Sequence, residues 1–145
     1  MVENQLMNQE SLAKQESLAK FLQVDIKDIK QLEHEDNVFV INNDWYMVLT
    51  NEEADEKAKE YIPRFMWAFN SSFLKTHMPE ETNKEIIESY QRKCERSGNV
   101  LKTMVVDLDQ FIEEVIGIYG RGFFISNYDQ QEEKQDNYFI YHIVN

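Results

Sequence analysis

The sequence predicts an α+β fold, in which a small antiparallel sheet packs against about four helices within a single domain. Residues 37–49 and 138–144 are rich in Val, Ile, Phe and Tyr, which is typical of strands. Between them, apolar residues in 51–120 recur at intervals of three and four, the period of amphipathic helices. The chain has 145 residues, the length of one domain.

The N-terminal residues form a polar segment rich in Gln, Asn and Glu. The motif QESLAK occurs in tandem at 9–14 and 15–20. We expect residues 1–16 to be a partly disordered extension and residues 17–145 to form the domain. The first helix is expected in two pieces, with Asp25 as the cap of the second.

A β-hairpin is predicted at 37–49, because the Asn-Asn-Asp sequence at 42–44 tolerates the positive φ angles of tight turns. A helix follows directly. Thr50 and Glu53 have the spacing of a capping box, in which each residue hydrogen-bonds the backbone N–H of the other.

Three further helices are expected before the chain returns to the sheet. Pro63 lacks a backbone N–H and should break the helix that begins after Thr50, so that 64–74 forms a separate apolar helix. The next two helices are predicted at 79–98 and 99–120, the second ended by glycine.

The C-terminal part is expected to be extended. Phe123–Ile125 and 138–144 have the composition of strands, and the polar residues 129–137 between them suggest a solvated loop. The simplest arrangement adds the last strand to the hairpin in an antiparallel sheet.

The net charge is the unusual property of the composition. Fifteen basic against 27 acidic residues give 15 − 27 = −12. This charge repels nucleic acid and anionic membranes, and it favours partners with basic surfaces. Many acidic domains are simply soluble, but the carboxylates could also mimic backbone phosphates. The acidic interaction surface is predicted to include Glu52, Glu53, Asp55, Glu56, Asp107, Asp109, Glu113 and Glu114.

Several classes of function are disfavoured. The one cysteine, Cys94, cannot form an internal disulfide and is expected to be a buried, inert thiol, which fits a reducing cytoplasm. No apolar run reaches the length of a membrane span, and there is no signal-peptide pattern. His34, His77 and His142 stand alone, and common catalytic motifs are absent. We therefore expect a non-enzymatic cytoplasmic protein with no metal and no cofactor.

Gly120-Arg121-Gly122 is the most distinctive short motif. Arginine suits the recognition of oxyanions, so Arg121 could bind an anion with Tyr128, Asp129 or His142 nearby. A small-ligand-binding protein or enzyme built on this loop is the alternative function. Trp67 is a further candidate for binding, and an aromatic surface could also support a homo-oligomer.

Two segments resemble a family of small, acidic, mostly uncharacterised proteins of bacteriophages and bacterial mobile elements. They are TNEEADEKAKEYI with the following WAFNSSFL, and GRGFFISNYD with the tyrosine-rich last strand. The chain departs from the family pattern at Pro63, at Phe123, where histidine is common, and at Gln130, where glycine is usual. The resemblance implies action on host machinery and supplies no catalytic residue.

These observations lead to one functional expectation. The chain is expected to be a non-enzymatic acidic binding protein of phage or mobile-element origin. Its partner would be a host protein with a basic surface, such as a CRISPR or restriction nuclease, in the manner of an anti-defence inhibitor. Direct binding to nucleic acid or a membrane is not expected.

Overall fold

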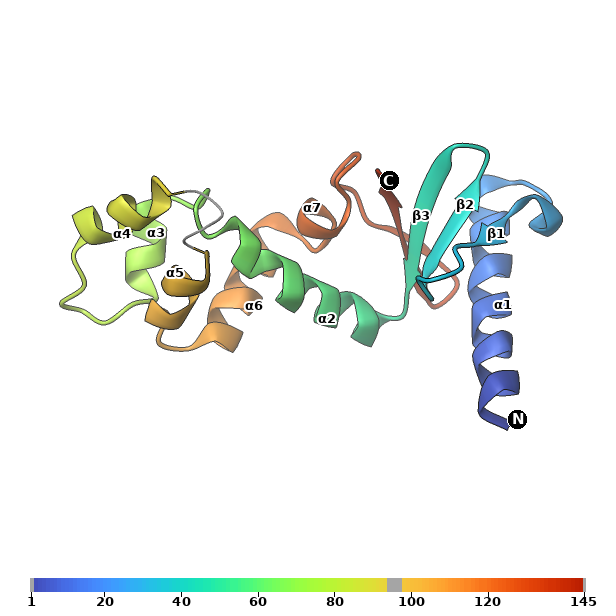
Figure 1. Cartoon of the computed structure of the whole chain (residues 1–145), viewed down its shortest axis with the longest axis horizontal. Coiled ribbons are helices and arrows are strands. Elements are labelled where there is room, and N and C mark those ends of the chain that lie inside the picture. Colours follow the sequence, from blue (N-terminus) through green and yellow to red (C-terminus); the bar gives the residue numbers. More distant parts are fainter. Residues whose placement is uncertain (1, 94–97, 145) are drawn as a thin grey trace. The chain divides into compact units, whose positions relative to one another are not determined.

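The computed structural model describes residues 2–93 and 98–144, and the side chains from Gln9 onward (Figure 1). It confirms the α+β class. Contacts between Cα atoms divide the chain into two compact units. Unit 1 comprises Met1–Glu56 and Arg121–Asn145, and unit 2 comprises Lys57–Gly120.

Unit 1 contains an antiparallel sheet with the strand order β1-β2-β3-β5-β4. The predicted hairpin and the addition of the C-terminal strand to it are both confirmed, since β3 pairs with β2 on one side and with β5 on the other. The strands are β1 (Lys30–Gln31), β2 (Val38–Ile41), β3 (Asp44–Leu49), β4 (Glu133–Gln135) and β5 (Tyr138–Ile143).

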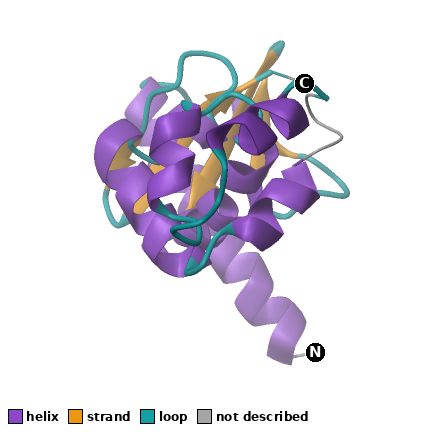
Figure 2. Cartoon of the chain, turned by 90° about the vertical axis from the view of Figure 1, so that its left-hand side faces the viewer, coloured by secondary structure: helices purple, strands orange, loops and turns teal. Residues whose placement is uncertain are grey.

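Helix α1 (Val2–Leu22) lies beside the sheet, and its first turns extend past the strands (Figures 1 and 2). Alternate strand residues face it, because successive side chains of a strand point to opposite faces. The helix therefore includes most of the segment expected to be an extension, and Lys14 within that segment is buried. The shared core contains Leu18, Ala19, Ile29, Phe39, Ile41, Tyr46, Val48 and Ile140.

The end of α1 follows the prediction of a helix in two pieces. Gln23 has a positive φ of 58°. The short 3-10 helix η1 (Ile26–Asp28) follows, and the Asp25 side chain accepts a hydrogen bond from Lys27 N at 3.0 Å. Asp25 therefore caps it as predicted.

Two predictions for the C-terminal part were wrong. Phe123–Ile125 belongs to the short helix α7 (Gly122–Ile125), not to a strand. The successive residues Phe124 and Ile125 of this helix are both buried, whereas a strand would direct them to opposite faces. The loop predicted at 129–137 contains β4, which pairs with β5 through a two-residue turn whose Asp136 has φ 57°.

Helix α2 (Asn51–Tyr61) begins at the predicted capping box. Thr50 N donates to Glu53 Oε1 at 2.8 Å, and Glu53 N donates to Thr50 Oγ1 at 3.2 Å. The break at Pro63 is confirmed, because the 3-10 helix η2 (Ile62–Phe65) replaces the α-helix there.

Other helices of unit 2 are shorter than the apolar periodicity predicts, since polar caps interrupt the pattern. The helix predicted at 64–74 is replaced by η2, a turn, and α3 (Ser71–Thr76), which Asn70 caps. The helix predicted at 79–98 is α4 (Lys84–Gln91), capped by Asn83. Cys94 lies outside the described residues.

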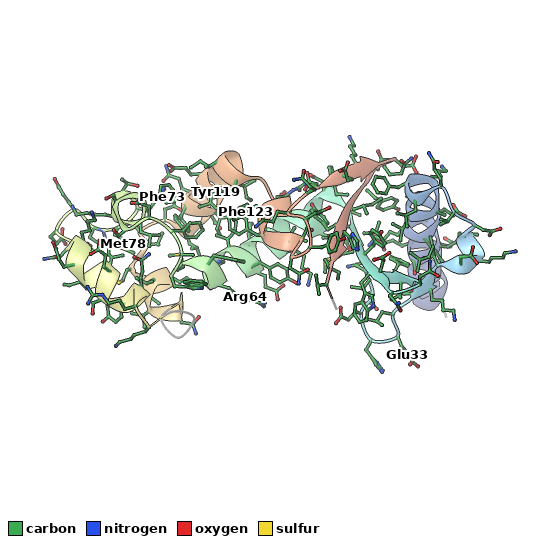
Figure 3. The ribbon with its side chains drawn as sticks, turned by 90° about the horizontal axis from the view of Figure 1, so that it is seen from above. Glu33, Arg64, Phe73, Met78, Tyr119 and Phe123 are labelled. Carbon is green, nitrogen blue, oxygen red and sulfur yellow. The ribbon has the colours of Figure 1, made fainter. Side chains whose placement is uncertain are left out.

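The helix predicted at 99–120 is two helices, α5 (Gly98–Met104) and α6 (Leu108–Tyr119). Asp107 separates them by accepting a hydrogen bond from Gln110 N at 3.2 Å, which starts α6. The predicted glycine stop is confirmed at Gly120, with φ 81°. Aromatic rings of α3, α6 and the turn before α3 pack together in this unit, among them Phe73 and Tyr119, labelled in Figure 3.

Candidate functional site

The negative charge is concentrated in unit 1. Its residues include 17 acids and 6 bases, so that 6 − 17 = −11, whereas unit 2 has 10 acids and 9 bases, so that 9 − 10 = −1. The two values add to the −12 of the chain. Unit 1 is therefore the part of the chain whose charge favours basic partners.

The predicted acidic residues divide between the units and between roles. In unit 1, Glu52, Asp55 and Glu56 are exposed, Glu53 pairs with Lys14, and Asp55 also pairs with Arg121. In unit 2, Asp107, Asp109, Glu113 and Glu114 are all exposed, although Asp107 caps α6 and Glu114 lies beside His77. Part of the predicted surface is thus used to hold the fold.

Unit 1 has a polar cavity of about 390 Å³, which we call the acidic pocket. It lies where α1, the loop between β1 and β2, and the start of α2 come together. Four carboxylates of the described residues line it, and Figure 3 shows Glu33 of that loop directed outward. The lining residues are Glu10, Ser11, Lys14, Gln31, Leu32, Glu33, Asp36, Asn37 and Glu53.

Among the described residues, Lys14 is the one cation that lines the acidic pocket, and only 2% of it is exposed. Its Nζ donates to Asn37 Oδ1 at 2.6 Å and to Glu53 Oε1 at 2.8 Å, and it lies 3.6 Å from Glu10 Oε1. The ammonium is thereby neutralised by its neighbours. Glu33 and Asp36 are both exposed and leave the pocket with excess negative charge.

Glu53 should give the acid stability of unit 1 a measurable pH dependence. Burial alone would raise its pKa, but hydrogen bonds from Lys14 and Thr50 outweigh burial and lower the pKa below 4.5. Glu53 therefore stabilises the fold above that ordinary value, and this contribution disappears as the pH falls through the lowered pKa. We expect Glu53→Gln to cost about 1 kcal/mol at pH 7, because the group is partly exposed.

The measurement is urea unfolding of the wild-type chain and of the Glu53→Gln variant, at pH values from neutral down through the lowered pKa of Glu53. The stability difference should be constant above about pH 5 and shrink below it. Glutamine can still accept the capping-box hydrogen bond, so the difference isolates the Lys14 pair. Glu52→Gln is the matched control; an equal effect of that variant would contradict the assignment.

Arg121 does not present a free guanidinium. Its side chain is 9% exposed, and Nε donates to Glu132 Oε1 at 2.9 Å while Nη1 donates to Asp55 Oδ1 at 2.9 Å. Nη1 also lies 3.0 Å from Asn51 Oδ1, and the group lies over the Phe139 ring at 4.7 Å. This arrangement does not favour an anion-binding role.

The Glu132 carboxylate, which binds Arg121, also links it to the sheet. Tyr141 is fully buried on β5, and its hydroxyl donates to Glu132 Oε1. Burial and this hydrogen bond raise the pKa of Tyr141, so the phenol stays protonated. Burial opposes the charge of Arg121, but the hydrogen bond and charge of Glu132 raise its pKa. Arg121, Glu132 and Tyr141 form one structural cluster.

The two glycines that flank Arg121 have separate roles. Gly120 takes the positive φ that ends α6, and its N–H donates to Ile116 O at 2.7 Å. At Gly122 an added Cβ would lie 2.6 Å from Gln131 C and 2.7 Å from Glu132 N. In this motif Gly120 ends a helix, Arg121 binds two carboxylates, and Gly122 allows two backbone segments to approach closely.

Tyr128 and His142, both candidates from the sequence, lie together. The His142 ring lies against Tyr46 at 4.5 Å and against Tyr128 at 3.8 Å between centroids. We call Tyr46, His142 and Tyr128 the aromatic stack. Tyr46 is buried and pairs with His142 across β3 and β5, whereas Tyr128 is 61% exposed.

Carboxylates flank the aromatic stack. Asp44 Oδ1 lies 3.3 Å from His142 Nε2. Asp129 follows Tyr128 directly, and its Oδ1 lies 2.9 Å from Ser126 Oγ. Burial, and then the charges of Asp44, Tyr128 and Asp129, raise the pKa of Tyr46. The exposed end of the stack is thus an aromatic ring in a negative field.

The remaining candidates lie in unit 2. Trp67 is 37% exposed in the turn between η2 and α3. His77 packs against Phe73 and Phe111, and its Nε2 lies 2.7 Å from Glu114 Oε2, although no described residue makes a hydrogen bond of normal geometry to that nitrogen. Within the described residues, no group of three or more His, Cys, Asp or Glu is placed to hold a metal ion.

Sequence reasoning missed Lys14, Asp44 and Tyr46. The spacing of Lys14 from Glu10 indicates a helical ion pair, but the burial of Lys14 beside Asn37 and Glu53 depends on long-range contacts.

None of the helices in the described ranges is long and apolar enough to span a lipid bilayer.

Together, the fold and the site define a small acidic α+β protein with a negatively charged sheet unit. Comparisons with protein-family models, with curated proteins and with solved structures gave no match. The resemblance to phage and mobile-element proteins stays a prediction.

Proposed function

We propose that the chain is a non-enzymatic binding protein whose unit 1 engages a basic surface of another protein. The observation that carries this proposal is the charge of −11 in unit 1 against −1 in unit 2. Exposed carboxylates at the acidic pocket form a concave surface that can receive Lys and Arg side chains.

The class of partner follows from the same charge. Grooves that bind nucleic acid carry clustered Lys and Arg, and carboxylates can occupy the positions of phosphates there. We propose a nucleic-acid-binding host protein, with CRISPR and restriction nucleases as the first to test. This setting also draws on the resemblance to proteins of bacteriophages and mobile elements, which makes an anti-defence inhibitor the specific form of the proposal.

Binding should compete with nucleic acid and weaken steeply with salt. We expect the chain to displace DNA from a purified partner nuclease, and to lose at least about tenfold in affinity between about 0.05 M and about 0.5 M salt. Displacement is measured by gel mobility shift and affinity by calorimetry. A complex with salt-independent affinity, or one that leaves DNA bound, would contradict the proposal.

A matched pair of charge variants separates the units. Neutralising the pocket carboxylates Glu10, Glu33 and Asp36 as their amides should weaken the complex about tenfold, at about 0.5 kcal/mol for each exposed charge. The control neutralises Glu80, Glu81 and Glu85, which are exposed in unit 2. Both variants remove three negative charges, so an equal loss would show that net charge alone, and not the pocket, drives binding.

A further inference from the structure

Tyr128 is an exposed aromatic side chain held in one place. Its ring lies 3.8 Å from the His142 ring, which rests in turn on the buried Tyr46. One face of Tyr128 is therefore covered, and the 61% exposure of the residue comes from the rest of the side chain. Rigid aromatic residues of this kind recur at protein interfaces because little conformational entropy is lost on binding.

Hydrogen bonds on both sides of Tyr128 hold the loop against β5. Ser126 Oγ donates to His142 O at 2.6 Å, and Val144 N donates to Asn127 Oδ1 at 2.7 Å. After Tyr128, Gln131 N donates to Asp129 Oδ1 at 3.0 Å. The position of the ring is thus set before any partner arrives.

The surroundings of Tyr128 select a cation. Asp44 and Asp129 are exposed beside the stack, and the whole of unit 1 carries −11. An aromatic face attracts a cation through its quadrupole, and nearby carboxylates add to that attraction.

The fold already uses this combination internally. The Arg121 guanidinium lies over Phe139 at 4.7 Å while two carboxylates bind its nitrogens. In unit 2, Arg64 lies over Tyr61 at 4.8 Å and pairs with Glu60 at 3.1 Å. Tyr128 with its flanking aspartates has the same components, but among the described residues no arginine lies over its ring.

We propose that the outer face of Tyr128 is a docking point for an arginine side chain of the partner protein, with Asp44 and Asp129 as flanking charges. The proposal rests on the proposed function and adds a side-chain preference to it. A planar guanidinium stacks on an aromatic ring better than an ammonium does, so arginine is favoured over lysine.

The test compares an arginine oligomer with a lysine oligomer of equal length, each titrated into the full chain at neutral pH and low salt. Both should bind to the acidic unit, and the arginine oligomer should bind about threefold more tightly. In Tyr128→Ala this preference should fall to about one while the lysine affinity is unchanged. Tyr128→Phe should keep the preference, because it retains the ring.

Controls keep the outcomes distinct. Tyr119 is an exposed tyrosine of unit 2, so Tyr119→Ala should leave the preference for arginine intact. Circular dichroism checks that each variant is folded. Equal binding of both oligomers to the wild-type chain, or an arginine preference that survives Tyr128→Ala, would overturn the docking point while leaving the acidic binding function in place. Binding of neither oligomer would overturn both proposals.

Discussion

Gly122→Ala is expected to destabilise unit 1 by about 3 kcal/mol, the upper end of the usual range for overpacked sites. The new methyl group would lie 2.6 Å from Gln131 C, 2.7 Å from Glu132 N and 2.9 Å from Gln131 O. These are backbone atoms, so no change of rotamer relieves the clash. The segment at 131–132 must move, and that movement pulls Glu132 away from Arg121 and Tyr141.

Tryptophan fluorescence can report the loss of stability in unit 1 separately from unit 2. Trp45 lies in β3 and Trp67 in unit 2, so Trp67→Phe leaves a fluorescent reporter in the sheet. Urea unfolding of Gly122→Ala in that background should shift to lower denaturant or show no folded baseline. Gly117→Ala is the matched control, because a Cβ there meets no atom of the described residues within 4 Å outside the backbone of its own helix. It should be neutral or stabilise α6 by up to about 1 kcal/mol.

Wild-type stability of the Gly122→Ala variant would be incompatible with the close approach of Gly122 to the backbone of 131–132. The motif would then need another explanation, such as contact with a ligand or partner.

Arg121→Ala is expected to cost about 2 kcal/mol, which is below the range for fully buried ion pairs because Asp55 and Glu132 are partly exposed. The change removes hydrogen bonds to both carboxylates and the packing on Phe139. It also leaves Glu132 charged beside the buried Tyr141 hydroxyl. Urea unfolding in the Trp67→Phe background measures the loss.

Two further arginine variants sharpen this test. Arg121→Lys should recover only part of the stability, since an ammonium cannot bond two carboxylates in the fixed geometry of the guanidinium. Arg64→Ala removes a surface arginine with one carboxylate partner and should cost less than about 1 kcal/mol. If Arg121→Ala proved as stable as the wild-type chain, the guanidinium would be free to serve a ligand, and the small-ligand alternative would gain support.

Local signals in the sequence were reliable where one segment contains both partners of an interaction. The capping box of Thr50 and Glu53, the cap at Asp25 and the break at Pro63 were all predicted and are all present. Each depends on residues within four positions of one another, so the pattern contains the physical cause.

Predictions failed where a short apolar or polar run fits more than one structure. Phe123–Ile125 has strand composition, but the close approach of Gly122 to 131–132 and the burial of two successive residues belong to a helical turn. The polar residues of β4 gave no strand signal, because pairing with β5 and not hydrophobicity holds that edge strand.

The sequence by itself determined the α+β class, the hairpin, the C-terminal strand and the net charge of −12. Only the tertiary structure decided that this charge lies almost entirely in unit 1, that Arg121 is bound by Asp55 and Glu132, and that Tyr128 rests on His142. The physical reason is distance along the chain. Arg121 and Asp55 are 66 positions apart, and no periodicity or propensity reports which distant side chains the folded backbone brings within hydrogen-bond reach.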